Sequence, residues 1–387
     1  MRKKRKRKSN SSRQHTERAV TLASVVLTFT AIFTAKIRHR RSMIALMTTL
    51  QPVSSTPRSH LQSSLAGAPR LGLGMASLGR PGYINLGHHE DLPKERTVEQ
   101  MREHAFTVLD EALALGLRYI DCARSYGLSE EFVAAWLASR GDAAAAVVTV
   151  GSKWGYEYTA NWRVHVDEGQ AHEVKKHTPE QLERQLAETL TLLPNIALYQ
   201  IHSATLESGV LTNDAVLEAL AQFRAQGVAV GASVSNPQLP ALEAAISVER
   251  GNAPLFASVQ ATFNLLDQSA GPLLQKAAEE GVFVIIKEAL ANGRLSSRGV
   301  GSSALEILSA EAAKLNTTVD ALALAWVLTF PWVGMCLSGA STCEQLRSNA
   351  DALRLAPLDA ALHTRLAKAL GQPVDEYWDA RKALKWN

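Results

Sequence analysis

Residues 119–131 read YIDCARSYGLSEE, and this stretch shows the plan on which most of the chain is built. A short apolar run comes first and carries Asp121 near its end, and a loop with Tyr126 and Gly127 follows. Continuous apolar runs of this length are typical of strands in a parallel sheet, because both faces of such a sheet are covered. From about residue 69 onward, the same succession of strand, loop and helix recurs.

Eight apolar runs are predicted to form strands. They are residues 71–76, 119–122, 147–152, 196–202, 229–233, 257–260, 282–286 and 334–337. Helical stretches with 3.6-residue apolar spacing lie between them, as at Phe106, Leu109 and Leu113. Capping boxes at 178–181 (TPEQ) and 341–344 (STCE) predict helix starts. Glycines at 116, 227 and 281 predict helix ends just before the next strand.

Polar side chains stand at or just past the C-terminal ends of seven of these runs. They are Asp121, Lys153, His202, Asn236, Gln260, Lys287 and Ser341. Chemistry gathered at the C-terminal ends of successive strands is typical of a parallel barrel. The predicted fold class is therefore α/β, a (β/α)8 TIM barrel over about 69–355. A doubly wound dinucleotide-binding fold is disfavoured, because no helix follows at once after the glycine-rich residues 72–79.

Four of the predicted site residues form a set suited to reducing a carbonyl with hydride. Negative charge grows on the carbonyl oxygen as hydride arrives, so a proton donor must stand beside it. Tyr126 can donate that proton, and the ammonium of Lys153 is expected to lower the pKa of the phenol. Asp121 would keep the partly buried lysine charged. A neutral His202 can donate a hydrogen bond to the carbonyl and orient it.

Five stretches resemble the signatures of the aldo-keto reductase family, in the family's order and approximate spacing. They are YIDCARSYGLSEE (119–131), VGSKWG (150–155), LYQIHS (198–203), GASVSN (231–236) and LSGASTCEQLRSN (337–349). The resemblance covers about 69–355 and implies a barrel that binds an extended nicotinamide dinucleotide. It implies a catalytic tetrad of Asp121, Tyr126, Lys153 and His202. It also implies that Ser235, Asn236 and Gln260 hold the nicotinamide carboxamide, and that Ser341, Gln345 and Asn349 meet the adenosine end, at a helix N-terminus that favours phosphate.

The chain departs from the family pattern in two respects. An aromatic residue usually ends the seventh strand and stacks on the nicotinamide, but this chain has Lys287 there, which could instead reach the diphosphate. Many members place a lysine and an arginine around the 2′-phosphate, and the corresponding residues here are Gly339 and Gln345. The resemblance favours NADP(H), and NAD(H) stays open as a competitor.

The longest insertion, residues 154–177, follows the third predicted strand. A long aromatic loop at this end of a barrel belongs over its mouth, so Trp154, Tyr156 and Trp162 are predicted to line the substrate site. The C-terminal residues, up to 387, hold further aromatic side chains that would either cover the mouth or dock as a helix on the barrel. The predicted substrate is a small aldehyde, ketone or alcohol.

Residues 1–68 are predicted to be a mostly disordered basic extension, with the barrel and its tail occupying 69–387. Residues 1–50 hold 13 Lys or Arg and one acid, a net charge of +12. Such a segment indicates a transit peptide for a plastid or mitochondrion. The alternatives are a membrane anchor at 19–35, which is not favoured, a nuclear-import run, or an over-extended start of a cytoplasmic protein.

The remaining 337 residues hold 28 basic and 36 acidic side chains, a net charge of −8, which argues against nucleic-acid binding. Three cysteines without a CxxC pair indicate a reducing compartment. The histidines lack metal-ligand spacing, so no metal is predicted. Two other functions stay open: a Schiff-base lyase using Lys153 or Lys287, and a non-catalytic barrel that senses a coenzyme.

Overall fold

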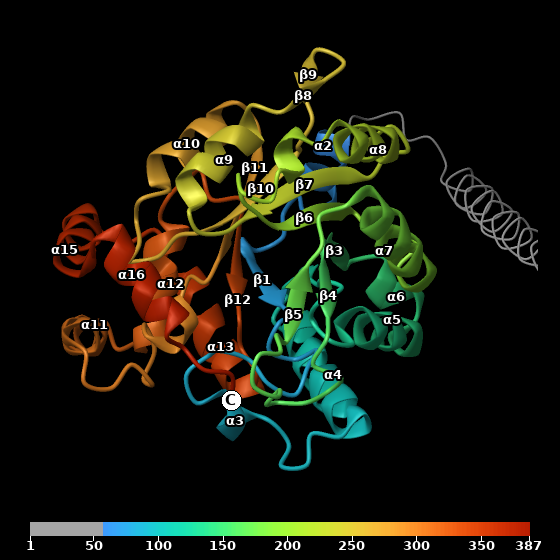
Figure 1. Ribbon diagram of the computed structural model, residues 1–387. Coiled ribbons are helices and arrows are strands. Elements are labelled where there is room, and N and C mark those ends of the chain that lie inside the picture. Colours follow the sequence, from blue (N-terminus) through green and yellow to red (C-terminus); the bar gives the residue numbers. More distant parts are fainter. Residues whose placement is uncertain (1–56) are drawn as a thin grey trace, which may run out of the picture. The chain divides into compact units, whose positions relative to one another are not determined.

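Eight parallel strands close into a barrel in the computed structural model, which describes residues 57–387 (Figure 1). Around the barrel the order is β1-β12-β11-β10-β7-β6-β3-β2. The strands are β1 (Leu71–Gly74), β2 (Tyr119–Asp121), β3 (Thr149–Trp154), β6 (Leu198–Ala204), β7 (Ala229–Val234), β10 (Ser258–Thr262), β11 (Phe283–Lys287) and β12 (Met335–Ser338). The predicted (β/α)8 fold is confirmed. Residues 1–56 of the predicted extension, which include the 19–35 segment, lie outside the described residues.

Helices follow the strands and form the outer layer. The longer ones are α4 (Val98–Ala114), α5 (Ser129–Arg140), α7 (Pro179–Leu192), α8 (Asp214–Arg224), α9 (Gln238–Ile246), α10 (Gly271–Glu279), α11 (Ser303–Lys314), α12 (Val319–Leu328), α13 (Cys343–Ala350), α15 (Ala360–Leu370) and α16 (Val374–Lys382). Short helices are α3 (His88–Asp91), α6 (Asp142–Ala145) and α14 (Ala352–Leu355). None of the helices in residues 57–387 is long and apolar enough to cross a membrane.

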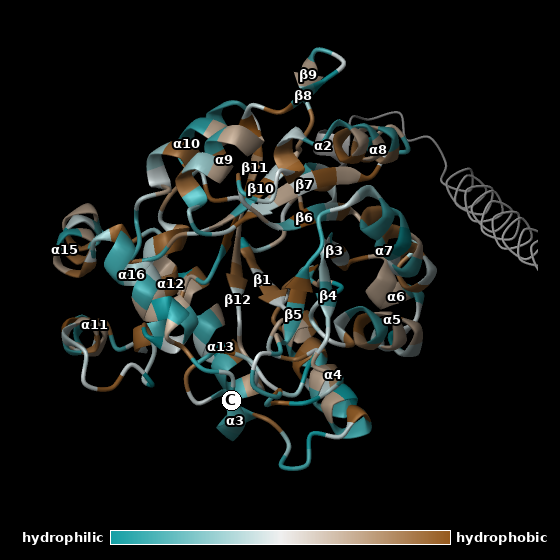
Figure 2. Ribbon diagram, viewed as in Figure 1, coloured by the Kyte–Doolittle hydropathy of each residue, from teal (hydrophilic) through white to brown (hydrophobic). Residues whose placement is uncertain are grey.

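The strands are buried on both faces, which explains why the sequence shows them as unbroken apolar runs. Figure 2 shows hydrophobic residues on β1 and β12, at the centre of the molecule. Glycine makes room inside the barrel where side chains would collide. A Cβ at Gly151 on β3 would lie 2.3 Å from the Tyr119 hydroxyl on β2, so only glycine lets that tyrosine fill the interior.

The predicted helix signals are largely confirmed. Thr178 caps α7 by accepting a hydrogen bond from the Gln181 amide, and Gly116, Gly227 and Gly281 all have positive φ. The second capping box is shifted by one residue. The side chain that caps α13 belongs to Thr342, which accepts from the Gln345 amide, so Ser341 lies in the loop before the helix.

A helix that precedes the first strand closes the N-terminal end of the barrel. This helix, α2 (Pro57–Ser64), carries Leu61, which is fully buried, and Leu65 follows it in the same core cluster as the strand starts. The predicted boundary at residue 68 is therefore wrong for residues 57–68, which belong with the barrel. The error arose because the sequence gives no sign that a short polar segment would place two leucines under the strands.

Leu61→Ala is expected to lower the free energy of unfolding by about 2–3 kcal/mol, because it removes a fully buried side chain and leaves a cavity. Chemical denaturation followed by circular dichroism measures the change. Leu61→Met keeps the volume and should cost less than about 1.5 kcal/mol. An equal loss in both variants would show that the contact does not depend on packing.

Two further segments reach the barrel mouth. The predicted long insertion forms an antiparallel hairpin of β4 (Tyr156–Tyr158) and β5 (Glu173–Lys175). The C-terminal residues form α16 and then run back, so that the Asn387 amide donates to the carbonyl of Tyr83 (3.0 Å). The tail thus does both things considered from the sequence: it docks a helix and it reaches the mouth.

Candidate active site

The four residues of the predicted tetrad meet at the C-terminal end of the barrel. Lys153 on β3 donates to the Asp121 carboxylate at the end of β2, to the Cys122 carbonyl (2.9 Å) and to the Tyr126 hydroxyl (3.2 Å). The Tyr126 hydroxyl lies 3.4 Å from His202 Nε2, on β6. Because β2, β3 and β6 are neighbours in the barrel, strand-end residues far apart in the sequence converge here.

Buried hydrogen bonds hold the ion pair in place. Asp121 is 2% exposed and Lys153 is fully buried. The second oxygen of Asp121 accepts from the hydroxyl of Tyr119 (3.2 Å) and from the amide of Gln260 (3.1 Å), which comes from β10 on the far side of the barrel. The carboxylate therefore has a partner at each oxygen, which is the condition under which a buried charge is tolerated.

Burial sets the protonation states of the two groups next to the ion pair. It raises the pKa of Tyr126 well above its usual value of 10; Asp121 adds to the rise and Arg80 opposes it. Burial thus outweighs the lowering of this pKa that the sequence predicted from Lys153. Burial also lowers the pKa of His202 well below 6.5, helped by Lys153 and Lys287. The phenol is thus protonated and the imidazole neutral.

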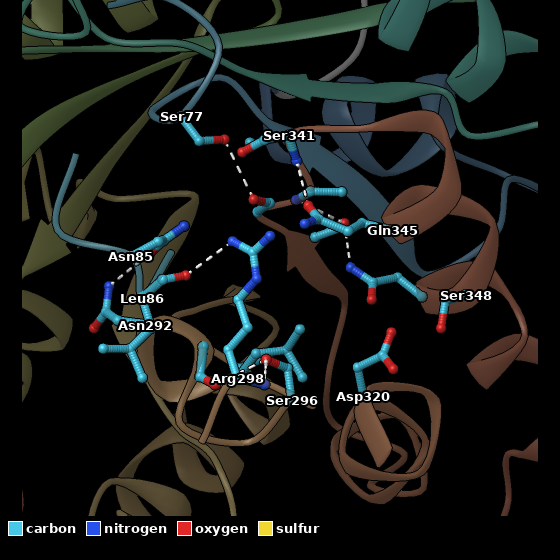
Figure 3. A pocket seen from close by; sticks show the side chains of 18 of the residues that line it. Ser77, Asn85, Leu86, Asn292, Ser296, Arg298, Asp320, Ser341, Gln345 and Ser348 are labelled. Atoms are coloured by element: carbon cyan, nitrogen blue, oxygen red, sulfur yellow. Dashed lines mark hydrogen bonds between the residues drawn. The ribbon is translucent and has the colours of Figure 1, made fainter. Parts of the chain in front are cut away.

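A cavity of about 870 Å³ begins at Asp121 and Tyr126 and extends to the N-terminal ends of α12 and α13. Three glycines, Gly74, Gly293 and Gly339, leave parts of its wall as bare backbone. Among the residues that line it, Lys287 and Arg298 are the basic ones, and Asp320 and Glu344 lie at the end far from Tyr126. Figure 3 shows Asp320 and Ser348 together at that end.

A loop after β1 crosses this cavity. The Asn85 side chain accepts from the amide of Asn292 (3.1 Å), and Arg298 donates to the Leu86 carbonyl (3.0 Å), as Figure 3 shows. Arg298 also pairs with the carboxylate of Asp91 (2.8 Å). These contacts join two segments that are about two hundred residues apart, so a ligand in the cavity would be held between them.

Most of the predicted coenzyme residues line this cavity. They are Gln260, Lys287, Ser341, Gln345 and Asn349. Ser341 is placed by two histidines: its hydroxyl lies 3.3 Å from His88 Nδ1, and its carbonyl lies 2.6 Å from His104 Nε2. The Gln345 side chain accepts from the Ser341 amide (2.9 Å).

Ser235 and Asn236 follow β7 and, like Ser233 within that strand, are not among the residues that line the cavity. Their contact with the nicotinamide carboxamide stays a prediction. β7 ends at Val234, and Asn236 is exposed in the turn that follows. Ser233 is the better candidate from this strand. It pairs in register with Gln260 and so shares the inward face, and its hydroxyl is buried without a hydrogen-bond partner among the described residues. The period-two alternation of strands could have shown this.

The three predicted substrate residues have different positions. Tyr156 lies beside the tetrad, with its ring centroid 5.1 Å from that of His202. Trp154 is fully buried, because it is still part of β3 and points to the face opposite Lys153, where it meets His177. Trp162 donates to the Arg96 carbonyl (2.8 Å) and packs against Phe132. Trp154, which is fully buried, is therefore not placed to line a substrate site, whereas the half-buried Trp162 makes packing contacts and its substrate role stays a prediction.

An aromatic cage around Arg80 was not predicted. The Arg80 guanidinium is buried and lies 4.8, 5.2 and 4.5 Å from the ring centroids of Tyr83, Tyr126 and Trp386. It also pairs with Glu173 of the β4–β5 hairpin (3.0 Å). The loop after β1, the hairpin and the C-terminal tail thus meet at the catalytic tyrosine candidate. Within residues 57–387, no group of three or more potential ligands is placed to hold a metal ion.

A closed parallel barrel with a Tyr–Lys–Asp–His cluster at the mouth of a long cavity defines a class of barrel oxidoreductases. The model of the Aldo/keto reductase family matches residues 70–370, so the chain belongs to that family and is an NAD(P)-dependent oxidoreductase. It is similar to the "Uncharacterized oxidoreductase YqkF" of Bacillus subtilis (strain 168), with 24% identity over 272 residues, 65% of this chain and 82% of that protein.

Two solved structures show the same fold. One is the aldo-keto reductase AKR11C1 from Bacillus halodurans in its holo form, with a TM-score of 0.56 and 24% identity, covering 78% of this chain and 91% of that one. The other is an aldo-keto reductase from Klebsiella pneumoniae in complex with NADPH, with a TM-score of 0.57 and 21% identity, covering 79% of this chain and 93% of that one.

Proposed function

We propose that this protein interconverts an aldehyde or ketone and its alcohol, with Tyr126 as the general acid and base. The observation that carries the proposal is the position of the Tyr126 hydroxyl, between Lys153 Nζ (3.2 Å) and His202 Nε2 (3.4 Å) at the end of a long cavity. A carbonyl oxygen that takes a place beside this hydroxyl would meet a proton donor and a second hydrogen-bond donor together.

The proposed role of each of the four residues follows from its charge. Tyr126, protonated because burial raises its pKa, gives its proton to the oxygen as negative charge develops there. Lys153 stabilises the tyrosinate that remains, from 3.2 Å away. Asp121 keeps the ammonium charged and fixed. His202, kept neutral by burial, orients the carbonyl without competing for the proton.

The cavity fits a nicotinamide dinucleotide in its extent and in its polar groups. A coenzyme supplies the hydride when bound. Gln260 and Ser233 would hold the ring's carboxamide, Arg298 would meet the diphosphate, and Ser341 and Gln345 would meet the adenosine end. The buried Asn292 Oδ1 lacks a hydrogen-bond partner among the described residues and is free to accept from a bound hydroxyl.

A coenzyme-coupled absorbance assay tests the proposal directly. The purified full-length protein is mixed with NADPH or NADH and a panel of aromatic, aliphatic and sugar-derived aldehydes and ketones. We expect oxidation of the coenzyme at a rate that depends on one of these carbonyls, with the alcohol formed in equal amount. If no carbonyl in the panel and no alcohol in the reverse direction were turned over, the proposal would fail.

NADP(H) is the coenzyme that the NADPH-bound neighbour favours, although the far end of the cavity carries the carboxylates of Asp320 and Glu344. Both would repel a 2′-phosphate placed there. We expect Asp320→Asn and Glu344→Gln each to raise kcat/KM for NADPH relative to NADH by about three- to tenfold, the size of one screened like-charge contact. Steady-state kinetics with both coenzymes measure the ratio, and an unchanged ratio in both variants would place the 2′-position elsewhere.

A further inference from the structure

Lys287 projects into the cavity from the side of the barrel opposite Lys153. It ends β11, and the barrel order places β11 four strands from β3 in either direction. Its neighbour in register is Thr262 of β10, and Lys287 Nζ donates to the Thr262 hydroxyl (3.0 Å). Among the described residues this is the one hydrogen bond that the lysine side chain makes. An ammonium has three donors, so two remain for a ligand.

Among the described residues, no carboxylate lies within ion-pair distance of the Lys287 ammonium, whose one hydrogen bond goes to Thr262. Asp121 pairs with Lys153, and Glu173 pairs with Arg80. Glu288, which follows the lysine in the sequence, pairs with Arg381 of α16, whose Nε lies 2.9 Å from both carboxylate oxygens. Glu288 also accepts a hydrogen bond from the Thr262 hydroxyl (3.1 Å). Burial alone would raise the pKa of Glu288, but Arg381 and Lys287 lower it to about 2. Glu288 is thus engaged by Arg381, although Glu288 and Asp267 still lie close enough to favour the charged form of Lys287.

Lys287 lies on the side of the rim from which the nicotinamide end of a coenzyme would approach Tyr126. The proton donor Tyr126 and its partners come from the β2, β3 and β6 side of the rim, whereas the cavity continues toward α12 and α13 on the β11 and β12 side. A hydride donor has to reach a carbonyl held at Tyr126, with the reacting atoms about 3–3.5 Å apart. A ring that carries the hydride would therefore have to come close to Tyr126, on the side of the rim that faces Lys287.

We propose that Lys287 makes the site bind reduced coenzyme more tightly than oxidised coenzyme. This inference rests on the proposed function. The nicotinamide ring is neutral when reduced and carries a positive charge when oxidised, so a fixed ammonium beside it repels the oxidised form only. The same repulsion promotes release of the oxidised coenzyme after each reduction, and it favours reduction over alcohol oxidation.

Equilibrium binding tests the proposal without any turnover. Quenching of tryptophan fluorescence gives the Kd of the full-length protein for NADPH, NADP⁺ and ADP-ribose, the last of which has the diphosphate but no nicotinamide. We expect Lys287→Met to tighten NADP⁺ relative to NADPH by about tenfold or more and to leave the Kd for ADP-ribose unchanged. Lys287→Arg keeps the charge and should keep the ratio.

Two outcomes would overturn the proposal. If Lys287→Met weakened NADPH, NADP⁺ and ADP-ribose equally, the lysine would act on the diphosphate. If the ratio of the two Kd values stayed as in the wild type, its charge would not reach the ring. Unaltered binding of ADP-ribose also shows that the variant is folded. Absence of carbonyl reduction by the wild type would count against the proposed function. The ratio of the Kd values for NADPH and NADP⁺ would still decide the role of Lys287.

The pH dependence of the ratio offers a second readout. Burial lowers the pKa of Lys287 to about 8, with Glu288 opposing the fall. The charged and titratable groups that face it are Glu288, Arg381, Lys153, Asp267 and His202. The pKa values of Glu288 and His202 are lowered and that of Arg381 is raised, so none of these three groups titrates between pH 7 and 9. The preference for NADPH should therefore shrink between pH 7 and 9 in the wild type and stay constant in Lys287→Met; equal behaviour in both would contradict the proposal.

Discussion

Tyr126→Phe is expected to lower kcat for carbonyl reduction by about a thousandfold, within the range that a lost general acid usually costs. The variant keeps the ring, and with it the edge contact to the His202 ring, but it removes the hydroxyl between Lys153 and His202. The proton must then come from water, which the buried ion pair does not position. Steady-state assays with the best carbonyl of the panel measure the loss.

Tyr158→Phe is the matched control. This tyrosine lies on β4 of the hairpin near the mouth, and it has no contact with Lys153 or His202 among the interactions of the described residues. We expect it to keep kcat within about threefold of the wild type, as for a surface-like change away from the reacting atoms. Retention of more than a tenth of the wild-type kcat by Tyr126→Phe would exclude the phenol as the general acid.

The parts of this site that the sequence could predict are those attached to strand ends. Asp121, Lys153 and His202 follow recognisable apolar runs, and parallel strands bring their C-terminal ends to one rim, so the convergence follows from the fold alone. The same logic places Gln260 in the cavity. Ser235 shows its limit: one residue past the strand end, the alternation of faces stops and the chain turns away.

Contacts between loops could not be predicted, because they depend on how three separate segments fold back over the mouth. Arg80, Glu173 and Trp386 are more than ninety residues apart in sequence, and nothing local in their sequence indicates that they meet. Leu61 raises the same difficulty at the other end of the barrel. The pKa of the Tyr126 phenol also could not be predicted, since it is set mainly by burial, which depends on how the segments pack over the mouth.

Lys153→Met should have the second large effect, on both turnover and stability. Without the ammonium, the tyrosinate loses its counter-charge and Asp121 is left buried without a cation, although Tyr119 and Gln260 still donate to it. Removing one partner of a buried ion pair usually costs about 3–5 kcal/mol of unfolding free energy. We therefore expect a lower denaturation midpoint and a fall in kcat of at least about a hundredfold.

The double variant Lys153→Met/Asp121→Asn separates these two effects. Neutralising Asp121 removes the unpaired buried charge, so the free energy of unfolding should recover by about 2 kcal/mol or more relative to the single variant. Activity should not recover, because the tyrosinate still lacks its cation. Lys175→Met serves as the control, since this lysine donates to the Ser203 carbonyl (2.9 Å) and has no contact with Tyr126 among the described interactions. If stability and activity recovered together in the double variant, the lysine's catalytic role would reduce to keeping the barrel mouth folded.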